Sequence, residues 1–272
     1  FWPVKHFTQI NEKFTLICCK HFIEWYDGGM YEYVGDFHTH SCVSQHAYST
    51  IHEMALAARS RGFKAFAVTD HGPGLFDGAM RHHFLCMNSL PDYIEGLRFF
   101  KGVETNIMDY DGGLDLDGPI LANLDFVVAS YHVECIAPAH AEDHTRGWIK
   151  AIESGMVDCL GHCGNPVFPF DHRAVVEACA EHGTAVEINN NSFEVRPGSI
   201  RNCREVLELC LEYDVPVLVN SDAHGMWSVG GFDQATQFLE EAGVPQSRIL
   251  NCDYEATCAF LQKRKAARRG AV

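Results

Sequence analysis

Seven short runs of apolar and β-branched residues recur along this chain, and segments with helical patterning separate most of them. The runs cover residues 33–37, 64–69, 99–103, 125–131, 157–161, 184–188 and 215–220. Between them, apolar residues repeat at helical spacing, as in Ile51, Met54, Ala55 and Ala58. Buried strands that alternate with helices form a parallel sheet. The chain is therefore predicted to have an α/β fold.

The polar residues beside these runs favour a closed sheet over an open one. Six of them come at or just past the end of a run: His38, His71, Glu104, His132, His162 and Asp222. In a β/α barrel, the carboxyl ends of the strands converge on one face and bring such residues together. An open doubly wound sheet would spread them along an edge. We therefore expect a distorted seven-stranded (β/α)7 barrel, similar to a TIM barrel.

These strand-end residues belong to a larger set of metal-ligand types, which His40, His46 and His224 complete. Imidazole suits zinc, iron and manganese, and carboxylates bridge or complete such sites. Taken singly, His38 and His40 are compatible with ordinary strand alternation, and Glu104 with a helix cap. Six strand ends with the same chemistry have no structural explanation of that kind. The set predicts a site for more than one metal ion, which is typical of hydrolases.

The beginning of the chain does not share this organisation. The chain starts at Phe1, and residues 14–19 form a possible short strand that no candidate ligand follows. Met30 stands directly before the first predicted barrel strand. We expect residues 1–29 to be an N-terminal extension that is artefactual or dispensable, and residues 30–272 to form one barrel domain, a size usual for such barrels.

Charge and cysteine usage limit the partners and the compartment. A net charge of −15 disfavours binding to nucleic acid or to an acidic membrane surface, because both need a basic face. The sequence has 12 cysteines but no CxxC pair, which indicates reduced thiols in a cytoplasmic protein. No apolar run approaches the roughly 20 residues that span a bilayer.

Eight short motifs carry a resemblance to the PHP family of metal-dependent phosphoesterases. They are Asp-Phe-His-Thr-His at 36–40, His-Ala-Tyr-Ser-Thr at 46–50, Thr-Asp-His-Gly at 69–72, Gly-Val-Glu-Thr-Asn-Ile at 102–107, Tyr-His at 131–132, Gly-His-Cys-Gly-Asn-Pro at 161–166, Glu-Ile-Asn-Asn at 187–190 and Ser-Asp-Ala-His at 221–224. Within the family, the chain most resembles the YcdX-type phosphatases, from about Met30 to about Phe260. The resemblance implies the PHP fold, a distorted seven-stranded barrel.

The resemblance also implies three divalent metal ions, usually zinc and sometimes manganese or iron. One ion would be held by His38, His40, Glu104 and Asp222. A second would be held by Glu104, His132 and His162, and a third by His46, His71 and His224, so that Glu104 bridges. Cys163 departs from the family, where proline is frequent after the histidine. It is either an extra soft ligand or a small buried filler.

Several further residues are candidates for roles beside the metals. Arg196, which follows the sixth predicted strand, is expected to grip phosphate, because guanidinium binds phosphate bidentately. His83 is expected to stand over the metals, as the family resemblance indicates. Asp36 and Asp70 either orient ligand imidazoles or cap turns. Asp222, His224 or a metal-bound water would protonate the leaving group.

The predicted function is a metal-dependent phosphatase that acts on small phosphorylated metabolites through a metal-activated water. A histidinol-phosphatase activity or a 3'-5' exonuclease activity of the PHP type is the alternative. The acidic charge and the lack of a basic stripe count against the exonuclease. A non-catalytic metal-binding module would predict degraded ligands, and all nine are intact. Relatives also make a homo-oligomer possible.

Overall fold

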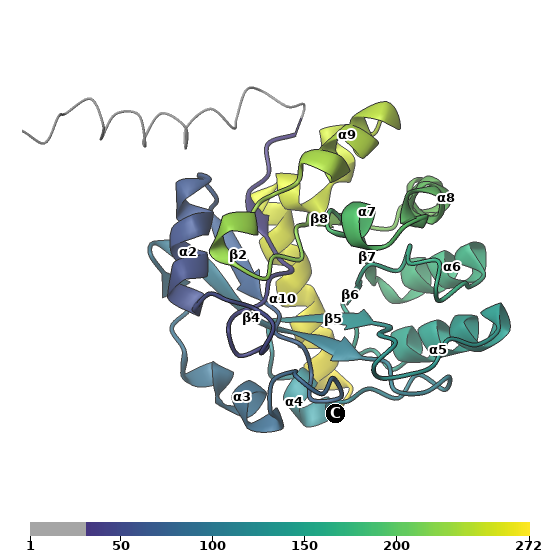
Figure 1. Cartoon of the computed structure of the whole chain (residues 1–272), viewed down its shortest axis with the longest axis horizontal. Helices are drawn as coiled ribbons and strands as arrows, with labels where there is room; N and C mark the ends of the chain where they lie inside the picture. The colour runs from purple at the N-terminus through teal and green to yellow at the C-terminus, as the bar shows by residue number, and fades with distance from the viewer. Residues whose placement is uncertain (1–30) are drawn as a thin grey trace, which may run out of the picture.

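The computed structural model describes residues 31–272, and the expected extension at 1–29 lies outside the described residues. Seven parallel strands form the centre of the molecule, with helices around them and α10 behind (Figure 1). The strands are β1 (Gly35–Asp36), β2 (Ala65–Val68), β4 (Leu97–Asn106), β5 (Phe126–Ser130), β6 (Cys159–Leu160), β7 (Ala185–Asn189) and β8 (Val217–Asn220). The predicted α/β fold and its seven strands are confirmed.

The strands pair in chain order, with the parallel partners β1-β2-β4-β5-β6-β7-β8. A short strand, β3 (Tyr93–Ile94), pairs antiparallel with the beginning of β4. Strand β4 is longer than its predicted run, so Glu104 lies inside the strand and not past its end. It pairs with Val128 of β5, and this register fixes the height of its carboxylate in the barrel.

The barrel is nearly closed between β1 and β8, although the two strands form no ladder. Thr39 and Ala223 make an isolated parallel bridge just beyond them. On the strands themselves, side chains replace the missing ladder: Asn220 Oδ1 accepts a hydrogen bond from the Phe37 amide at 3.0 Å. The Asn251 amide group donates to the carbonyls of Gly35 (3.1 Å) and Val219 (2.6 Å). This seam brings the ligand motifs of the first and last strands together.

The helices are α2 (Ile51–Ser60), α3 (Arg81–Cys86), α4 (Gly118–Leu121), α5 (Ala141–Glu153), α6 (His172–His182), α7 (Ser192–Val195), α8 (Ser199–Glu212), α9 (Asp233–Glu241) and α10 (Tyr254–Gly270). Short 3-10 turns lie at Met87–Ser89, Met226–Ser228, Gln246–Arg248 and Leu250–Cys252. Local sequence sets several ends. Thr50 and Glu53 form a capping box at the start of α2, and Gly183 ends α6 in the left-handed conformation.

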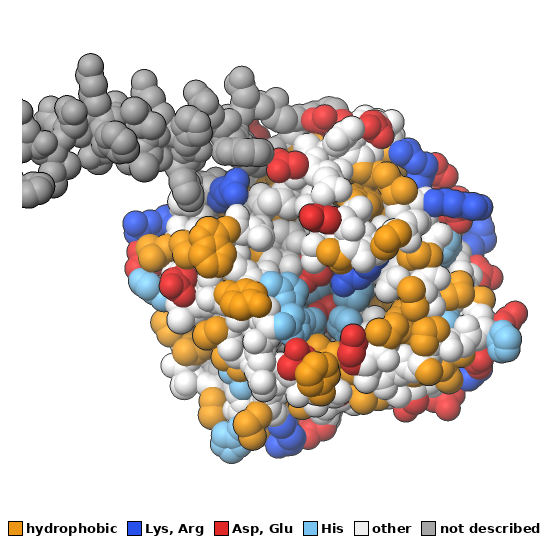
Figure 2. All heavy atoms as spheres, viewed as in Figure 1, with side chains coloured by type: hydrophobic (Ala, Val, Ile, Leu, Met, Phe, Trp, Pro, Cys, Tyr) orange, Lys and Arg blue, Asp and Glu red, His pale blue; other side chains and the backbone are white. Residues whose placement is uncertain are grey.

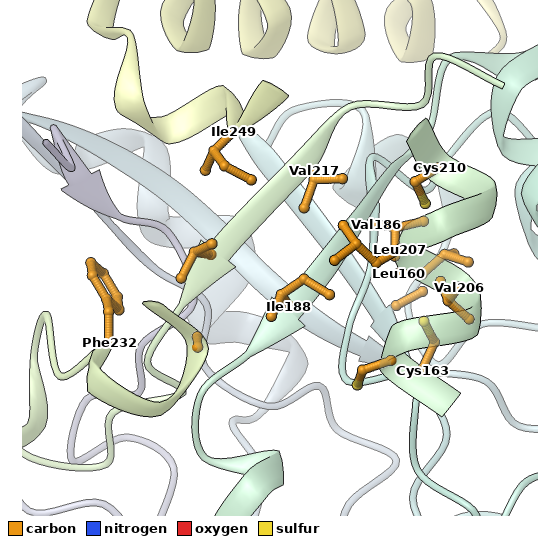
Figure 3. Packing of buried hydrophobic residues seen from close by; sticks show 14 of the residues in the cluster. Leu160, Cys163, Val186, Ile188, Val206, Leu207, Cys210, Val217, Phe232 and Ile249 are labelled. Atoms are coloured by element: carbon orange, nitrogen blue, oxygen red, sulfur yellow. The ribbon is translucent and has the colours of Figure 1, made fainter. Parts of the chain in front are cut away.

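The core has an outer layer, in which helices pack on the strands. Figure 3 shows Val186 and Ile188 of β7 lying near Val206 and Leu207 of α8. A second cluster fills the barrel interior, and Leu261 of α10 joins it from one end. All these side chains are buried, so the apolar faces that alternate with helical spacing in the sequence are the faces that pack.

Helix α10 closes the amino ends of the strands through a buried ionic cluster. Arg264 Nε lies 3.1 Å from Asp158 Oδ1, and Arg268 pairs with the other oxygen of the same carboxylate. The Arg268 guanidinium also donates to the carbonyls of Leu121 and Leu124. The amino end of the barrel is therefore sealed, and the candidate ligands lie at the opposite end. No helix among residues 31–272 is long and apolar enough to cross a membrane.

Candidate metal centre

Glu104 lies at the centre of the predicted ligand set, and its two carboxylate oxygens face different histidines. Oε2 lies 2.7 Å from His71 Nδ1, 3.4 Å from His38 Nε2 and 3.7 Å from His40 Nε2. Oε1 lies 2.8 Å from His162 Nε2 and 3.5 Å from His132 Nε2. A carboxylate shared between two groups of imidazoles has the arrangement of a bridging ligand.

The last three predicted ligands adjoin this group. Asp222 Oδ1 lies 3.1 Å from His40 Nε2 and 3.8 Å from His38 Nε2. His224 and His46 bring their Nε2 atoms within 3.0 Å of one another. Their rings and that of His40 stack in a row, with centroids 4.3 Å and 4.8 Å apart. All nine predicted ligands are thus brought together at one end of the barrel.

Buried atoms without hydrogen-bond partners indicate what the cluster fits. They include His38 Nε2, His40 Nδ1, His71 Nδ1 and Glu104 Oε2, all within the described residues. Buried polar atoms are normally paired, and leaving one unpaired costs about 1–3 kcal/mol. Here several lone pairs are turned toward one another. Histidine nitrogens and carboxylate oxygens in this arrangement fit divalent cations.

Among residues 31–272, three trios have ligand atoms within 4.8 Å of one another: His38, His40 and Glu104; His71, Glu104 and His132; and His40, His71 and His224. The first trio agrees with one of the implied metal positions. The others differ from the implied grouping, because His71 lies against Glu104 as well as near His224. His71 therefore faces two candidate positions in this structure, where the resemblance assigns it to one.

Outer polar groups hold several of the imidazoles in orientation. His38 Nδ1 lies 2.7 Å from Glu187 Oε1, and His132 Nδ1 lies 2.7 Å from Asn106 Oδ1. These contacts turn Nε2 of each ring toward Glu104. Such outer contacts are typical of metal-binding histidines and fix the tautomer and the ring orientation.

Sequence reasoning did not identify these orienting residues. Glu187 and Asn106 lie in motifs that carry the family resemblance, at 187–190 and 102–107, but neither is among the predicted site residues. The sequence does contain a sign of the role of Glu187: its carboxylate lies between Val186 and Ile188 in an apolar strand. A buried charge without a partner is costly, so a carboxylate at such a position needs a partner. Asp77, whose Oδ2 lies 2.8 Å from His46 Nδ1, gave no comparable signal because it lies in a loop.

The buried carboxylates stay ionised. Burial by itself would raise the pKa of Glu104, yet the neighbouring histidines, His38 first, hold the pKa well below its usual range. The pKa of Asp222 is likewise held well below its usual value, against burial, by His38, His40 and Arg196. The centre therefore offers fixed negative charge at neutral pH, which favours cation binding.

The histidines divide into two groups. Burial would lower the pKa of His38, but the carboxylates of Glu187 and Glu104 outweigh it and raise the pKa well above the ordinary value. The pKa of His71 is also raised, because Glu104 outweighs burial. Burial lowers the pKa of three other histidines: His40, His132 and His224. The lowered group is neutral at pH 7, as metal ligands must be.

Two candidate ligands occupy strained backbone positions. Asp222 has a φ of 57° and His162 a φ of 30°. The left-handed region is uncommon for residues other than glycine, and it costs on the order of 1–3 kcal/mol. At Asp222 the strain accompanies a side chain that reaches His38 and His40. Such conformations concentrate at functional sites because they aim side chains that an extended chain would misdirect.

Arg196 lies at the edge of the centre, as the sequence predicts. It follows α7, and its Nη1 donates to Ser192 Oγ at 3.1 Å and lies 3.5 Å from Asp222 Oδ2. The side chain is partly exposed, at 17%. A guanidinium held beside the centre with part of its surface open is compatible with the predicted phosphate contact, which stays a prediction.

The candidates at Asp36, Asp70 and His83 have separate surroundings. Asp36 accepts hydrogen bonds from the Ser221 hydroxyl and the Gly230 amide, so it ties loops together and orients no ligand imidazole. Asp70 accepts from Ser41 and Ser44. Its Oδ2 also lies 3.3 Å from His83 Nε2, an atom without a hydrogen-bond partner. Among the described residues, His83 makes no hydrogen bond, ion pair or ring contact with a candidate ligand.

Cys163 is a core residue. It is buried in the same apolar cluster as Cys203 and Cys210, and Figure 3 shows it pointing toward α8. Burial raises the pKa of its thiol well above the usual value, which disfavours the thiolate that a metal would need. Of the two expectations for this residue, the buried filler is the one that the structure bears out.

The centre opens to solvent at one edge. The side chains of His46 and His224 are 39% and 27% exposed, whereas that of His132 is 12% exposed and the other histidines of the set are less exposed. Figure 2 shows histidine side chains gathered in a hollow of this face, with acidic, basic and hydrophobic side chains beside them. A small molecule can therefore reach the centre from this face.

Comparison with known proteins gives a consistent family. The family model described as "PHP domain" matches residues 36–191. A "Probable phosphatase" of Acetivibrio thermocellus is 41% identical over 234 residues, which cover 86% of this chain and 97% of that protein. A "Probable phosphatase" of Aeromonas hydrophila is 40% identical over 237 residues, covering 87% and 96% of the two chains.

Two solved structures share the fold. The crystal structure of histidinol phosphate phosphatase from Lactococcus lactis, complexed with zinc, L-histidinol and phosphate, has a TM-score of 0.53 and 18% identity. It covers 77% of this chain and 93% of that chain. A chain of archaeal ribonuclease P with mature tRNA also has a TM-score of 0.53, at 14% identity, covering 86% and 93%. At such identities the likeness shows the fold alone.

Proposed function

This chain belongs to the PHP domain family, and from that premise we propose that it hydrolyses phosphoric monoesters of small metabolites with the help of divalent metal ions. The coarser statement, that it is a phosphatase, accords with the relatives of about 40% identity that bear this name. The finer statement depends on one observation. The two oxygens of the buried Glu104 carboxylate face separate sets of histidines, and several of the facing atoms have no hydrogen-bond partner.

We infer that three divalent ions, zinc by preference and manganese or iron as alternatives, occupy the centre. The residues that would hold them are His38, His40, His46, His71, Glu104, His132, His162, Asp222 and His224. Bound ions of this kind supply Lewis acidity and lower the pKa of a water toward 7. The protein contributes the fixed charge and the orientation of the ligands.

Arg196 would bind a phosphoryl oxygen at the edge of the centre. Its guanidinium is held by Ser192 and lies near Asp222, and it carries N–H groups beyond those two contacts. Guanidinium N–H groups match phosphate geometry and stabilise charge that develops on phosphoryl oxygens. Arg81 is a weaker candidate, because it pairs with Asp117 and both side chains are about half exposed.

The source of the proton for the leaving alkoxide stays a prediction. The candidate donors are Asp222, His224 and a metal-bound water. The pKa of Asp222 is well below its usual value and the pKa of His224 is lowered. Both groups are therefore unprotonated at neutral pH, which favours water as the donor. His83, which lies near Asp70, remains a proposed catalytic-site residue.

A histidinol-phosphatase activity is the second candidate, supported by the shared fold of the Lactococcus lactis enzyme. A 3'-5' exonuclease is disfavoured because a chain with a net charge of −15 repels a polyanion. A cytoplasmic location, a homo-oligomer and the YcdX-type subgroup are further proposals from the sequence.

One experiment separates these activities. Protein purified without chelators is screened against phosphorylated metabolites, histidinol phosphate and oligonucleotides, and metals are counted on the same sample. We expect release of inorganic phosphate from monoesters and none from oligonucleotides. His40→Ala serves as the inactive control, because it removes a candidate ligand. Nuclease activity without monoesterase activity would contradict the proposal.

A further inference from the structure

Three exposed aromatic side chains belong to the segments that carry His46, Asp77 and His224 at the open edge of the metal centre. Tyr48 is 75% exposed, Phe76 is 84% exposed and Trp227 is 70% exposed. Tyr93 is the fourth exposed aromatic residue of the described chain, at 62%, and it lies on β3 beside the beginning of β4, far from the carboxyl ends of the strands. Single exposed apolar residues are ordinary, but a group at the mouth of a site indicates a binding surface.

The three aromatic residues stand beside the two most exposed histidines of the centre. Tyr48 lies two residues after His46, and its amide donates to the His224 carbonyl at 2.9 Å. Phe76 directly precedes Asp77, whose carboxylate holds His46 Nδ1. Tyr48 and Phe76 are therefore tied to the His46 and His224 pair, and Trp227 follows His224 by three residues.

Hydrogen bonds between the loops fix the positions of this group. The Gln45 amide donates to the Asp77 carbonyl at 2.9 Å, and the Met226 amide donates to Ser49 Oγ at 2.9 Å. Trp227 packs its indole over Gly225, where an added Cβ would lie 3.0 Å from the ring. Glycine at this position lets the ring approach the backbone beside His224. The exposed rings are thus carried on loops that are joined to one another.

The open edge also determines where the organic part of a substrate must lie. The phosphoryl group has to reach the buried carboxylates and Arg196, which lies beside Asp222. The alcohol part of the bound ester must extend toward solvent where the centre is open, at the edge formed by His46 and His224. Tyr48, Phe76 and Trp227 are the exposed aromatic residues of the segments at this edge, and hydrophobic side chains lie beside the histidines in Figure 2.

We propose that the aromatic rim formed by Tyr48, Phe76 and Trp227 selects phosphomonoesters whose alcohol part carries a flat, uncharged aromatic ring. This inference rests on the proposed phosphatase function and narrows its substrate class. Aromatic side chains stack on planar groups, and such contacts contribute binding energy without hydrogen bonds. None of the three rim residues is a candidate metal ligand. Substitutions in the rim should therefore change substrate preference without changing metal binding.

The test compares two alkyl phosphates with similar leaving groups, 2-phenylethyl phosphate and propyl phosphate, with 2-cyclohexylethyl phosphate as a probe that is apolar but not flat. We expect kcat/KM for the phenylethyl ester to exceed that for the propyl ester about tenfold, which corresponds to ~1.4 kcal/mol. The cyclohexylethyl ester should fall between them. Trp227→Ala should reduce the phenylethyl preference to about twofold or less, and Trp227→Phe should restore most of it.

Tyr93→Ala is the matched control, since it removes an exposed aromatic ring at the other end of the barrel and should leave all three rates unchanged. Equal kcat/KM for the three esters would overturn the rim while the phosphatase proposal stands. If the protein hydrolyses none of the three esters, both the phosphatase proposal and the proposed role of the rim are wrong. Light scattering shows whether Trp227→Ala dissociates an oligomer. If it does, and if the variant keeps the preference for the phenylethyl ester, the rim is a contact between subunits and the inference is wrong.

Discussion

Oε2 of Glu104 lies 2.7 Å from Nδ1 of His71, although the two atoms do not have the alignment of a hydrogen bond. The other oxygen, Oε1, accepts from Ser130 Oγ at 2.6 Å and lies 2.8 Å from His162 Nε2. The carboxylate is therefore shared between two halves of the centre. A change at this residue should affect more than one metal position.

Glu104→Ala should lose more than one metal ion per chain, because both oxygens of the carboxylate serve the centre. Wild-type protein should retain roughly three ions, as in multinuclear hydrolase sites. Elemental analysis of gently purified protein measures both. Glu208→Ala, an exposed glutamate on α8, is the control and should retain the full content. At most one ion in wild-type protein would contradict the trinuclear arrangement.

Glu187→Gln should weaken metal binding and leave the fold intact. Oε1 of the carboxylate contacts His38 Nδ1 and accepts a hydrogen bond from the side-chain amide of Asn220. Oε2 accepts a hydrogen bond from the backbone amide of His162. A neutral amide cannot accept all of these bonds, so the His38 ring loses its fixed orientation. Loss of such an outer partner typically costs about 10- to 100-fold in metal affinity. Competition with a zinc chelator measures it, and an unchanged affinity would rule out the orienting role.

Zinc binding at pH 7 should release protons. The pKa of His38 is held well above its ordinary value, so this ring is protonated in the metal-free protein at pH 7, and the raised pKa of His71 increases the protonated fraction of that ring. A metal ion that binds to these rings displaces their protons. In the metal-free protein the raised pKa values of His38 and His71 stabilise the folded state. This stabilisation is complete at a pH below the pKa that the two histidines have in the unfolded chain. That contribution is lost as pH rises through the folded-state pKa.

Calorimetry of zinc binding in buffers with different ionisation enthalpies counts the released protons. At least one proton per chain is expected at pH 7, and fewer at pH 9. A heat of binding that does not depend on the buffer at pH 7 would show that the His38 ring is neutral before the metal binds.

Arg196→Ala should keep the full metal content and lower phosphomonoester turnover. A hydrogen bond to a charged group contributes about 1.5–3 kcal/mol, so kcat/KM should fall roughly 10- to 150-fold. Inhibition by inorganic phosphate should weaken in parallel. Arg201→Ala, which removes an 84% exposed arginine on α8, is the control. Wild-type kinetics in Arg196→Ala would move phosphate recognition to Arg81 or His83.

Arg268→Ala should destabilise the barrel without affecting the metals. The guanidinium pairs with Asp158 and donates to two carbonyls in a fully buried position. Breaking a buried ion pair by removing one partner costs about 3–5 kcal/mol of unfolding free energy. Urea denaturation measures the loss. Arg269→Ala, an exposed neighbour on the same helix, should change the free energy by less than about 0.5 kcal/mol.

The sequence alone determined the fold class and the strands, because apolar runs that alternate with helical patterns leave few ways to bury both faces of a sheet. It also identified the nine candidate ligands, since residues such as His38 and Asp222 stand beside strand ends in recognisable motifs. The carboxyl ends of parallel strands lie at the same end of a barrel. The local pattern therefore predicts that these residues lie close together.

Only the tertiary structure decided which atoms face one another. The place of Glu104 inside β4 and of His71 between two trios depends on strand register and barrel closure, which no local pattern encodes. Glu187 contacts His38, which lies just past β1, because the closed barrel brings β7 and the end of β1 together. The aromatic rim likewise joins loops from both ends of the chain. These relationships span up to about 180 residues, and only the closed barrel brings such distant side chains into contact.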